Sequence, residues 1–116
     1  MASETRFPFQ SLDVYVAARE LAARVQASRI SDDELRDQAT RAAKSAFLNL
    51  AEGLPADSAG LRRRAFAVAN GSLHEAVAAV DLAACLGAIA PADAEAIQAL
   101  GLRVKRMLRA LGTGAR

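Results

Sequence analysis

The residues that could do chemistry in this chain are mainly cationic, and they gather in two places. The first group is Arg62, Arg63 and Arg64, and the second is Arg103, Lys105, Arg106 and Arg109. Arginine pairs with phosphate and carboxylate oxygens through two parallel hydrogen bonds. We predict that these residues contact the phosphate backbone of RNA or DNA and do not read bases. The chain has no Trp and only 4% aromatic residues on which bases could stack.

Each group also has a plainer explanation. Three consecutive residues of a helix point in different directions, so Arg62, Arg63 and Arg64 cannot form one flat patch, and we expect solvent or carboxylates around them. Cations near the end of a helix also compensate its dipole. Arg106 and Arg109 nevertheless lie three residues apart on one face, which makes the second group the better candidate for phosphate.

Residues typical of catalysis are sparse. His74 is the only histidine and has no Glu three residues before it, whereas di-iron bundles use paired Glu-x-x-His motifs. We expect a capping or interface role for His74, and a buried, unreactive thiol for Cys85, the only cysteine. Glu52 is expected to pair with Arg41, Arg64 or a neighbouring subunit. We therefore predict that the protein is not an enzyme and that it binds no metal and no cofactor.

The length and composition of the chain indicate its class. A chain of 116 residues has the size of one domain, and its apolar residues, 53% of the total, are mainly Ala, Leu and Val, which suits closely packed helices. No apolar stretch approaches the roughly 20 residues of a membrane span. The start of the chain contains an acidic residue and does not resemble a secretory signal. With a single cysteine, these features predict a soluble protein of the reducing cytoplasm.

Apolar periodicity and cap residues predict four helices. They cover about residues 11–28, 31–53, 58–87 and 91–112. The first should be capped by Ser11 or Asp13, and the second should begin with a capping box of Ser31 and Glu34. Gly71 lies inside the third helix, where glycine is unfavourable, and indicates a close helix crossing or a local kink, of which we favour close packing against a neighbouring helix.

The predicted fold class is all-α, an antiparallel up-down-up-down four-helix bundle, because short connections favour antiparallel neighbours. The bundle should span residues 11–112, between an N-terminal extension of residues 1–10 and a frayed C-terminus of residues 113–116. A second apolar row does not fit within the inward-facing stripes, and we predict that it forms a subunit interface. This row consists of Phe47, Leu48, Val68, Leu82 and Leu86.

Two segments carry a family signature. One runs from Leu35 to Gly53 and ends in Asn-Leu-Ala-Glu-Gly, and the other is the Gly-Ser-Leu-His-Glu segment that begins at Gly71. Together with the opening Phe9–Tyr15, they resemble the bacterial four-helix-bundle proteins first noticed as reading frames within intervening sequences of large-subunit ribosomal RNA genes. The resemblance implies a ring-like homopentamer. It also implies a relation to the accessory proteins of diversity-generating retroelements, which bind nucleic acid beside a reverse transcriptase.

These observations lead to one functional hypothesis and one alternative. The hypothesis is a non-enzymatic, homo-oligomeric scaffold or adaptor, pentameric by resemblance, which binds the backbone of RNA or DNA through its Arg-rich surfaces. The alternative is a protein-binding module that docks a partner helix on the exposed apolar row and binds no nucleic acid. Neither hypothesis involves a membrane. The exposed surface distinguishes the two, because a continuous basic belt favours nucleic acid and an exposed apolar groove favours a peptide partner.

Overall fold

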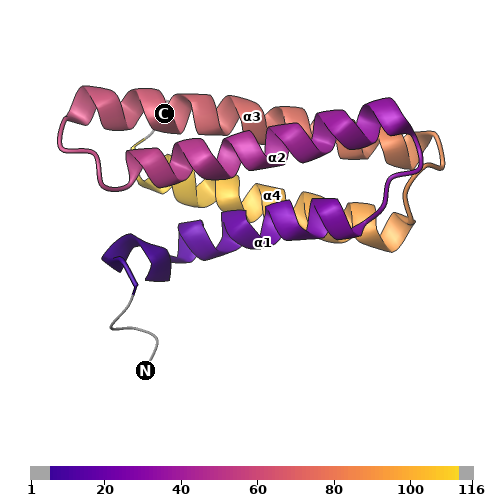
Figure 1. Ribbon diagram of the computed structural model, residues 1–116, viewed down its shortest axis with the longest axis horizontal. Coiled ribbons are helices and arrows are strands. Elements are labelled where there is room, and N and C mark those ends of the chain that lie inside the picture. Colours follow the sequence, from indigo (N-terminus) through magenta and orange to yellow (C-terminus); the bar gives the residue numbers. More distant parts are fainter. Residues whose placement is uncertain (1–5, 113–116) are drawn as a thin grey trace.

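The computed structural model describes residues 6–112, and within them the chain is an all-α four-helix bundle, as the sequence predicts (Figure 1). A short 3-10 helix, η2, precedes four α-helices. The elements are η2 (Pro8–Ser11), α1 (Asp13–Ala27), α2 (Asp33–Gly53), α3 (Ala59–Cys85) and α4 (Pro91–Ala110). The predictions for residues 1–5 and for the C-terminal residues 113–116 lie outside the described residues. None of the described helices is both long and apolar enough to cross a membrane.

The four helices lie side by side, and each is joined to the next by a short loop after which the chain turns back (Figure 1). Helix α1 packs against α2 and α4, and α3 packs against the same two helices, with the most extensive contact between α2 and α3. Alanines fill much of the α2–α3 interface, and Ala39, Ala76 and Ala83 are completely buried. Small side chains let the two helix backbones approach closely, which explains how a core with few aromatic residues reaches a tight packing.

The aromatic residues gather at one end of the core. The ring of Tyr15 lies between Phe9 and Phe47, with centroid distances of 5.5 Å and 4.9 Å, respectively. Phe47 is therefore partly buried against the core of its own subunit. This position differs from the surface position predicted for Phe47. The reason is that the large ring of Tyr15 provides an apolar partner on α1, which helical periodicity within α2 could not reveal.

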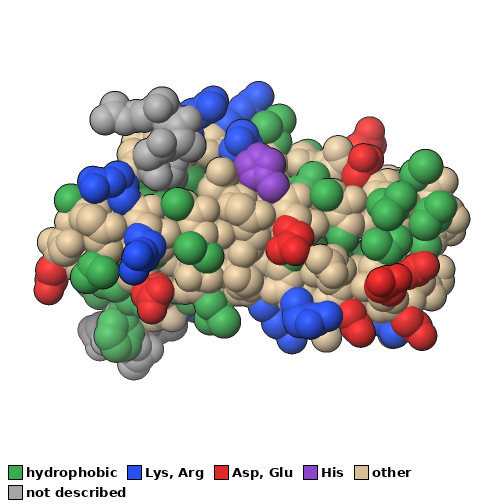
Figure 2. All heavy atoms as spheres, turned by 90° about the horizontal axis from the view of Figure 1, so that it is seen from above, with side chains coloured by type: hydrophobic (Ala, Val, Ile, Leu, Met, Phe, Trp, Pro, Cys, Tyr) green, Lys and Arg blue, Asp and Glu red, His purple; other side chains and the backbone are tan. Residues whose placement is uncertain are grey.

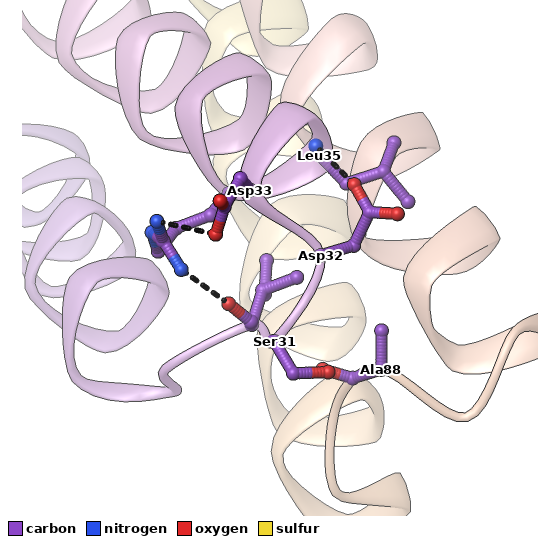
Figure 3. Close-up of polar contacts among 7 residues, drawn as sticks. Ser31, Asp32, Asp33, Leu35 and Ala88 are labelled. Carbon is purple, nitrogen blue, oxygen red and sulfur yellow. Dashed lines mark hydrogen bonds and ion pairs between the residues drawn. The ribbon is translucent and has the colours of Figure 1, made fainter.

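The start of α2 is capped by a different residue from the one predicted (Figure 3). Asp32 is the N-cap, and its carboxylate accepts a hydrogen bond from the backbone N–H of Leu35 at 2.9 Å. The predicted capping box of Ser31 and Glu34 does not form. Ser31 instead donates through its backbone N–H and its hydroxyl to the carbonyl of Ala88, at 2.8 and 3.3 Å. Because α2 begins one residue later than predicted, Ser31 does not cap it. Ser31 instead links the α1–α2 connection to the α3–α4 loop.

The other helix ends agree with the sequence in part. Ser58 caps α3 by accepting from the N–H of Leu61 at 3.2 Å, and Pro91 is the first residue of α4, so both helices begin within one residue of the starts predicted at about 58 and 91. Neither Ser11 nor Asp13 caps α1, because Leu12 occupies the N-cap and the Ser11 hydroxyl donates to Pro8 O within η2. Helix α3 ends at Cys85, two residues earlier than expected, since Gly87 adopts a left-handed conformation.

Two further predictions about the third helix are wrong. A Cβ built on Gly71 has no neighbouring atom within 4 Å, so this glycine faces open space and does not mark a close helix crossing. Cys85 is exposed, because it lies with Leu82 and Leu86 on the outer face of the last turn of α3, whereas Ala83 of the same turn is buried. The close contacts occur instead at Gly53, which faces the ring of Phe66, and at Gly101, which faces Val77.

Candidate interaction surfaces

The two signature segments meet across a polar seam between α2 and α3. Ser45 and Ser72 share a hydrogen bond, with their hydroxyl oxygens 2.8 Å apart. Two turns before Ser45 on α2, the side-chain amide of Gln38 donates to the Glu75 carboxylate at 2.9 Å. Within α2, Asn49 donates to the carbonyl of Ser45 at 2.9 Å. The Ser45–Ser72 and Gln38–Glu75 contacts cross between the helices and are compatible with one register of α2 against α3. The signature residues of the seam therefore hold the helix pair together.

An apolar groove runs between α3 and α4 on the opposite side of α3. Its volume is about 550 Å³, and Leu73 and Val77 on α3 and Gly101 and Leu102 on α4 contribute to its lining. Gly101 shapes the groove because the absence of a side chain lets Val77 come within 2.8 Å of the position a Cβ would take. Leu102 remains exposed at the rim. The sequence does not reveal this groove, since residues of two helices far apart in the chain form it.

One end of the groove is cationic. The Nδ1–H of His74 donates to the carbonyl of Asn70 at 2.8 Å, because a carbonyl oxygen can only accept. This arrangement leaves Nε2 of His74 to accept a hydrogen bond from the Lys105 ammonium at 3.1 Å. His74 thus links α3 to α4. The bond places the charge of Lys105 at the groove, and the capping or interface role expected for His74 stays a prediction.

The other end of the groove is acidic. Asp81 on α3 and Glu95 on α4 line it, and both side chains are exposed. Figure 2 shows this polarity on the face that it presents, with the histidine next to Lys and Arg side chains and with acidic side chains farther toward the end where α3 finishes. The groove therefore combines an apolar floor with opposite charges at its two ends.

The basic residues predicted to contact phosphate fall into different environments. Arg62 is held within the subunit, because its guanidinium donates to the carbonyl of Leu54 at 3.3 Å and lies over the ring of Phe66 at 5.2 Å from the centroid. Arg63 and Arg64 are exposed. The structure therefore does not bring the run of three arginines together as one surface, and the roles of the exposed Arg63 and Arg64 stay predictions.

The second basic group is more coherent. Arg103, Arg106 and Arg109 are exposed on successive turns of α4, and no carboxylate among residues 6–112 forms a salt bridge with them. Their three-residue spacing places neighbouring members on overlapping parts of the outer face. Lys105 belongs to the groove instead, through its bond with His74. Three arginines on one face of α4 are consequently the best phosphate-binding candidates among the predicted residues.

A third basic surface was missed from the sequence. Arg41 and Lys44 of α2 line a hollow between α1 and α2 together with Gln26, and neither cation forms a salt bridge with the described residues. Arg36 lies at the same hollow, but its guanidinium already pairs with the Asp33 carboxylate at 2.9 Å and donates to the carbonyl of Ile30 at 3.1 Å. The signal in the sequence was the three-residue spacing of Arg41 and Lys44, which share a helix face.

The predicted interface residues do not form one continuous face. Leu48, Val68, Leu82 and Leu86 are exposed, as a subunit interface requires, whereas Phe47 is partly buried against the core. Leu48 lies on α2, and Val68 lines a hollow between α2 and α3. Leu82 lies 14 residues beyond Val68 on α3, about 21 Å along a helix. Val68, Leu82 and Leu86 thus lie at different heights on one face of α3, and Leu48 lies on another helix.

Two other predicted roles can be located. Among residues 6–112, Glu52 forms no salt bridge with Arg41 or Arg64, although Glu52 and Arg64 line the same hollow. The predicted pairing within the subunit is therefore absent, and the pairing with a neighbouring subunit stays a prediction. In the same described range, no group of three or more His, Cys, Asp or Glu side chains is placed to hold a metal ion.

The fold and these surfaces define a small all-helical bundle whose signature residues join α2 to α3. The family model described as 23S rRNA-intervening sequence protein matches residues 10–110, so the chain belongs to this family. The family resemblance inferred from the sequence motifs is thereby confirmed. A comparison with curated proteins gives no match.

Proposed function

We propose that this protein is a non-enzymatic, homo-oligomeric scaffold or adaptor of the cytoplasm, assembled as a homopentamer, that binds the phosphate backbone of RNA or DNA. The proposal has two parts, assembly and nucleic-acid binding. Different surfaces of the bundle support them, and different measurements test them.

The assembly part is supported mainly by exposed apolar residues on the outer side of α3. This helix buries a full inner stripe, yet Leu61, Val68, Leu82 and Leu86 are exposed on its other side. Single exposed leucines are ordinary, but several of them along one helix indicate a surface that another protein covers. Membership of the family supports a pentamer through the resemblance described above.

The nucleic-acid part is supported by Arg103, Arg106 and Arg109 on α4. Arginines without carboxylate partners are free to pair with phosphate. In a ring, every subunit would present this arginine surface. The assembly would therefore carry a belt of cationic sites, although the formal net charge is only +2 per chain. Such binding depends on counterion release and is expected to weaken steeply as salt rises.

Two measurements test the proposal. Light scattering at micromolar concentration should give a mass of about five times the 12.2 kDa of one chain, and a monomer would contradict the assembly part. Fluorescence anisotropy with structured RNA and with duplex DNA should show binding at low salt and a linear loss of log affinity with log salt concentration. Absence of binding at low salt would leave a scaffold only.

The α3–α4 groove favours a second candidate function. A monomer that binds no nucleic acid would match a protein-binding module, in which an amphipathic helix of another protein lies in the groove. This candidate predicts a monomeric mass in the light-scattering experiment. The two functions are therefore separated by the first measurement.

A further inference from the structure

The hollow between α1 and α2 has a polar wall that carries both signs of charge. Its volume is about 440 Å³, within the range of roughly 300–1,000 Å³ typical of small-ligand sites. On α2 the wall consists of Asp37, Thr40, Arg41 and Lys44, and Gln26 faces them from the last turn of α1. Thr40, Arg41 and Lys44 follow Asp37 at helical spacing, so the four residues share one face of α2.

The two cations of this face are free to bind an anion. Within residues 6–112, neither Arg41 nor Lys44 forms a salt bridge. Arg41 also lines a neighbouring hollow with Glu75, but that carboxylate accepts a hydrogen bond from Gln38 at 2.9 Å. Two cations one helical turn apart on the same face can together hold the oxygens of a phosphate group.

A carboxylate beside these cations makes the hollow a poor site for phosphate alone. Asp37 lies one turn before Arg41, and it too forms no salt bridge with the residues that the structure describes. Its charge repels a phosphate, but its oxygens accept hydrogen bonds from hydroxyl groups. The 2′-hydroxyl of ribose is such a donor, and DNA lacks it. A phosphate group next to a ribose hydroxyl therefore matches the hollow better than a phosphate group by itself.

Neutral side chains on both helices complete the polar lining. The half-buried Thr40 has a hydroxyl that can donate or accept, and the amide of Gln26 can do both from the other side. Because α1 and α2 run in opposite directions (Figure 1), the last turn of α1 lies beside the first turns of α2, where Asp37 is located. Sugar hydroxyls thus find hydrogen-bonding groups on both walls.

We propose that the α1–α2 hollow binds the ribose-phosphate backbone of RNA, with Arg41 and Lys44 on phosphate oxygens and Asp37 accepting from a ribose 2′-hydroxyl. This inference rests on the nucleic-acid part of the proposed function and narrows its ligand to RNA. It adds a contact surface on a different pair of helices from the arginines of α4. Phosphate contacts alone do not distinguish RNA from DNA, so the preference comes from Asp37.

Three single strands of one sequence test the preference. The sequence contains only A and C, so that the strands differ in the sugar alone, and they are RNA, DNA and 2′-O-methyl RNA. The methyl group removes the hydroxyl proton that Asp37 would accept. By fluorescence anisotropy, the wild-type protein should bind RNA about 2- to 10-fold more tightly than either other strand, the range for one net hydrogen bond. Equal affinities for the three strands would overturn the inference.

Asp37→Ala should abolish this preference. The affinity for DNA should not fall, because the substitution removes a negative charge from beside the phosphates. The ratio of RNA to DNA affinity should therefore decrease to about one, whereas a purely electrostatic role of Asp37 would raise both affinities equally and leave the ratio unchanged. A preference for RNA that persists in Asp37→Ala would also overturn the inference.

Asp81→Ala is the matched control. Asp81 is an exposed carboxylate on α3, outside the hollow, and its substitution changes the net charge by the same amount. The RNA-to-DNA ratio should stay at its wild-type value in this variant. Circular dichroism verifies that both variants remain helical. An equal loss of the ratio in the two variants would assign the preference to net charge and overturn the role of Asp37.

Arg41→Ala and Lys44→Ala separate this inference from the proposed function. Each should weaken binding of all three strands and lower the slope of log affinity against log salt by about 0.7. Binding that weakens in Arg106→Ala but not in Arg41→Ala or Lys44→Ala would overturn the inference and leave the α4 surface standing. Absence of binding of any strand at low salt would overturn both.

A free ribonucleotide presents the same chemistry as an RNA strand, so AMP is added as a competitor. One nucleotide makes only the contacts of one hollow, whereas a strand reaches further cations. AMP should therefore displace the RNA only at concentrations far above that of the strand. Displacement by AMP at a concentration equal to that of the strand would identify a free ribonucleotide as the ligand and overturn the assignment to RNA.

Discussion

The ring of Phe66 occupies the space that a side chain on Gly53 would need. An ideal Cβ at Gly53 would lie 2.7 Å from Cε1 of Phe66, which is completely buried. This contact joins the last turn of α2 to the first turns of α3, directly beside the connecting loop. The glycine of the first signature segment is thus explained by packing inside one subunit.

Gly53→Ala should destabilise the bundle. The added methyl group has to displace a buried ring, and overpacking of this kind costs about 1–3 kcal/mol. Urea unfolding followed by circular dichroism measures the change. Gly71→Ala is the matched control, because a Cβ there meets no atom within 4 Å and alanine is the better helix former. It should stabilise the helix by up to about 1 kcal/mol; equal effects of the two variants would contradict the packing described for Gly53.

Asp32→Ala should cost more stability than Ser31→Ala. Asp32 caps α2 by accepting from Leu35 N–H at 2.9 Å, and loss of an N-cap costs about 0.5–2 kcal/mol. The Ser31 hydroxyl makes only a 3.3 Å bond to Ala88 O, and the backbone bond of Ser31 to the same carbonyl remains in the variant. Thermal unfolding of the two variants compares them directly. A larger loss of stability in Ser31→Ala than in Asp32→Ala would indicate that Ser31 caps α2.

Arg29→Gly should raise stability. Among residues 6–112, Arg29 is the one non-glycine residue with positive φ, 54°, at the turn that follows α1. A side chain in the left-handed conformation costs about 1–2 kcal/mol, which glycine does not incur. Part of this gain is lost to the greater freedom of glycine in the unfolded chain. A higher midpoint in urea is expected for Arg29→Gly, and a lower one for Arg19→Gly inside α1; a lower midpoint for both would refute the strain at Arg29.

Arg106→Ala and Arg109→Ala should weaken nucleic-acid binding without affecting the fold. If each arginine neutralises one phosphate, the slope of log affinity against log salt should fall by about 0.7–0.9 for each residue removed. Arg62→Ala is the control, since Arg62 is held by Leu54 O and the Phe66 ring. It should lower the unfolding midpoint and leave the slope unchanged. If only Arg62→Ala reduced the slope of log affinity against log salt, the binding surface would lie on α3 and the prediction for α4 would be wrong.

Local chemistry in the sequence determined the helices themselves. Apolar residues at three- and four-residue spacing place Phe66, Leu73 and Val80 on one side of α3, and they are buried there. Ser58 and Pro91 mark helix starts because caps and first-turn prolines act within one turn. The two signature segments likewise sufficed for the family, since their residues are contiguous in the chain.

The tertiary structure alone decided which surfaces remain for function. Phe47 is covered by Tyr15 from another helix, and the ends of α2 and α3 bring Arg62 to Leu54. The groove needs Leu73 and Leu102, and helical periodicity gives no information about which face of α3 meets which face of α4. Burial and charge pairing depend on contacts between residues distant in the chain. A pattern that repeats every three or four residues cannot encode such contacts.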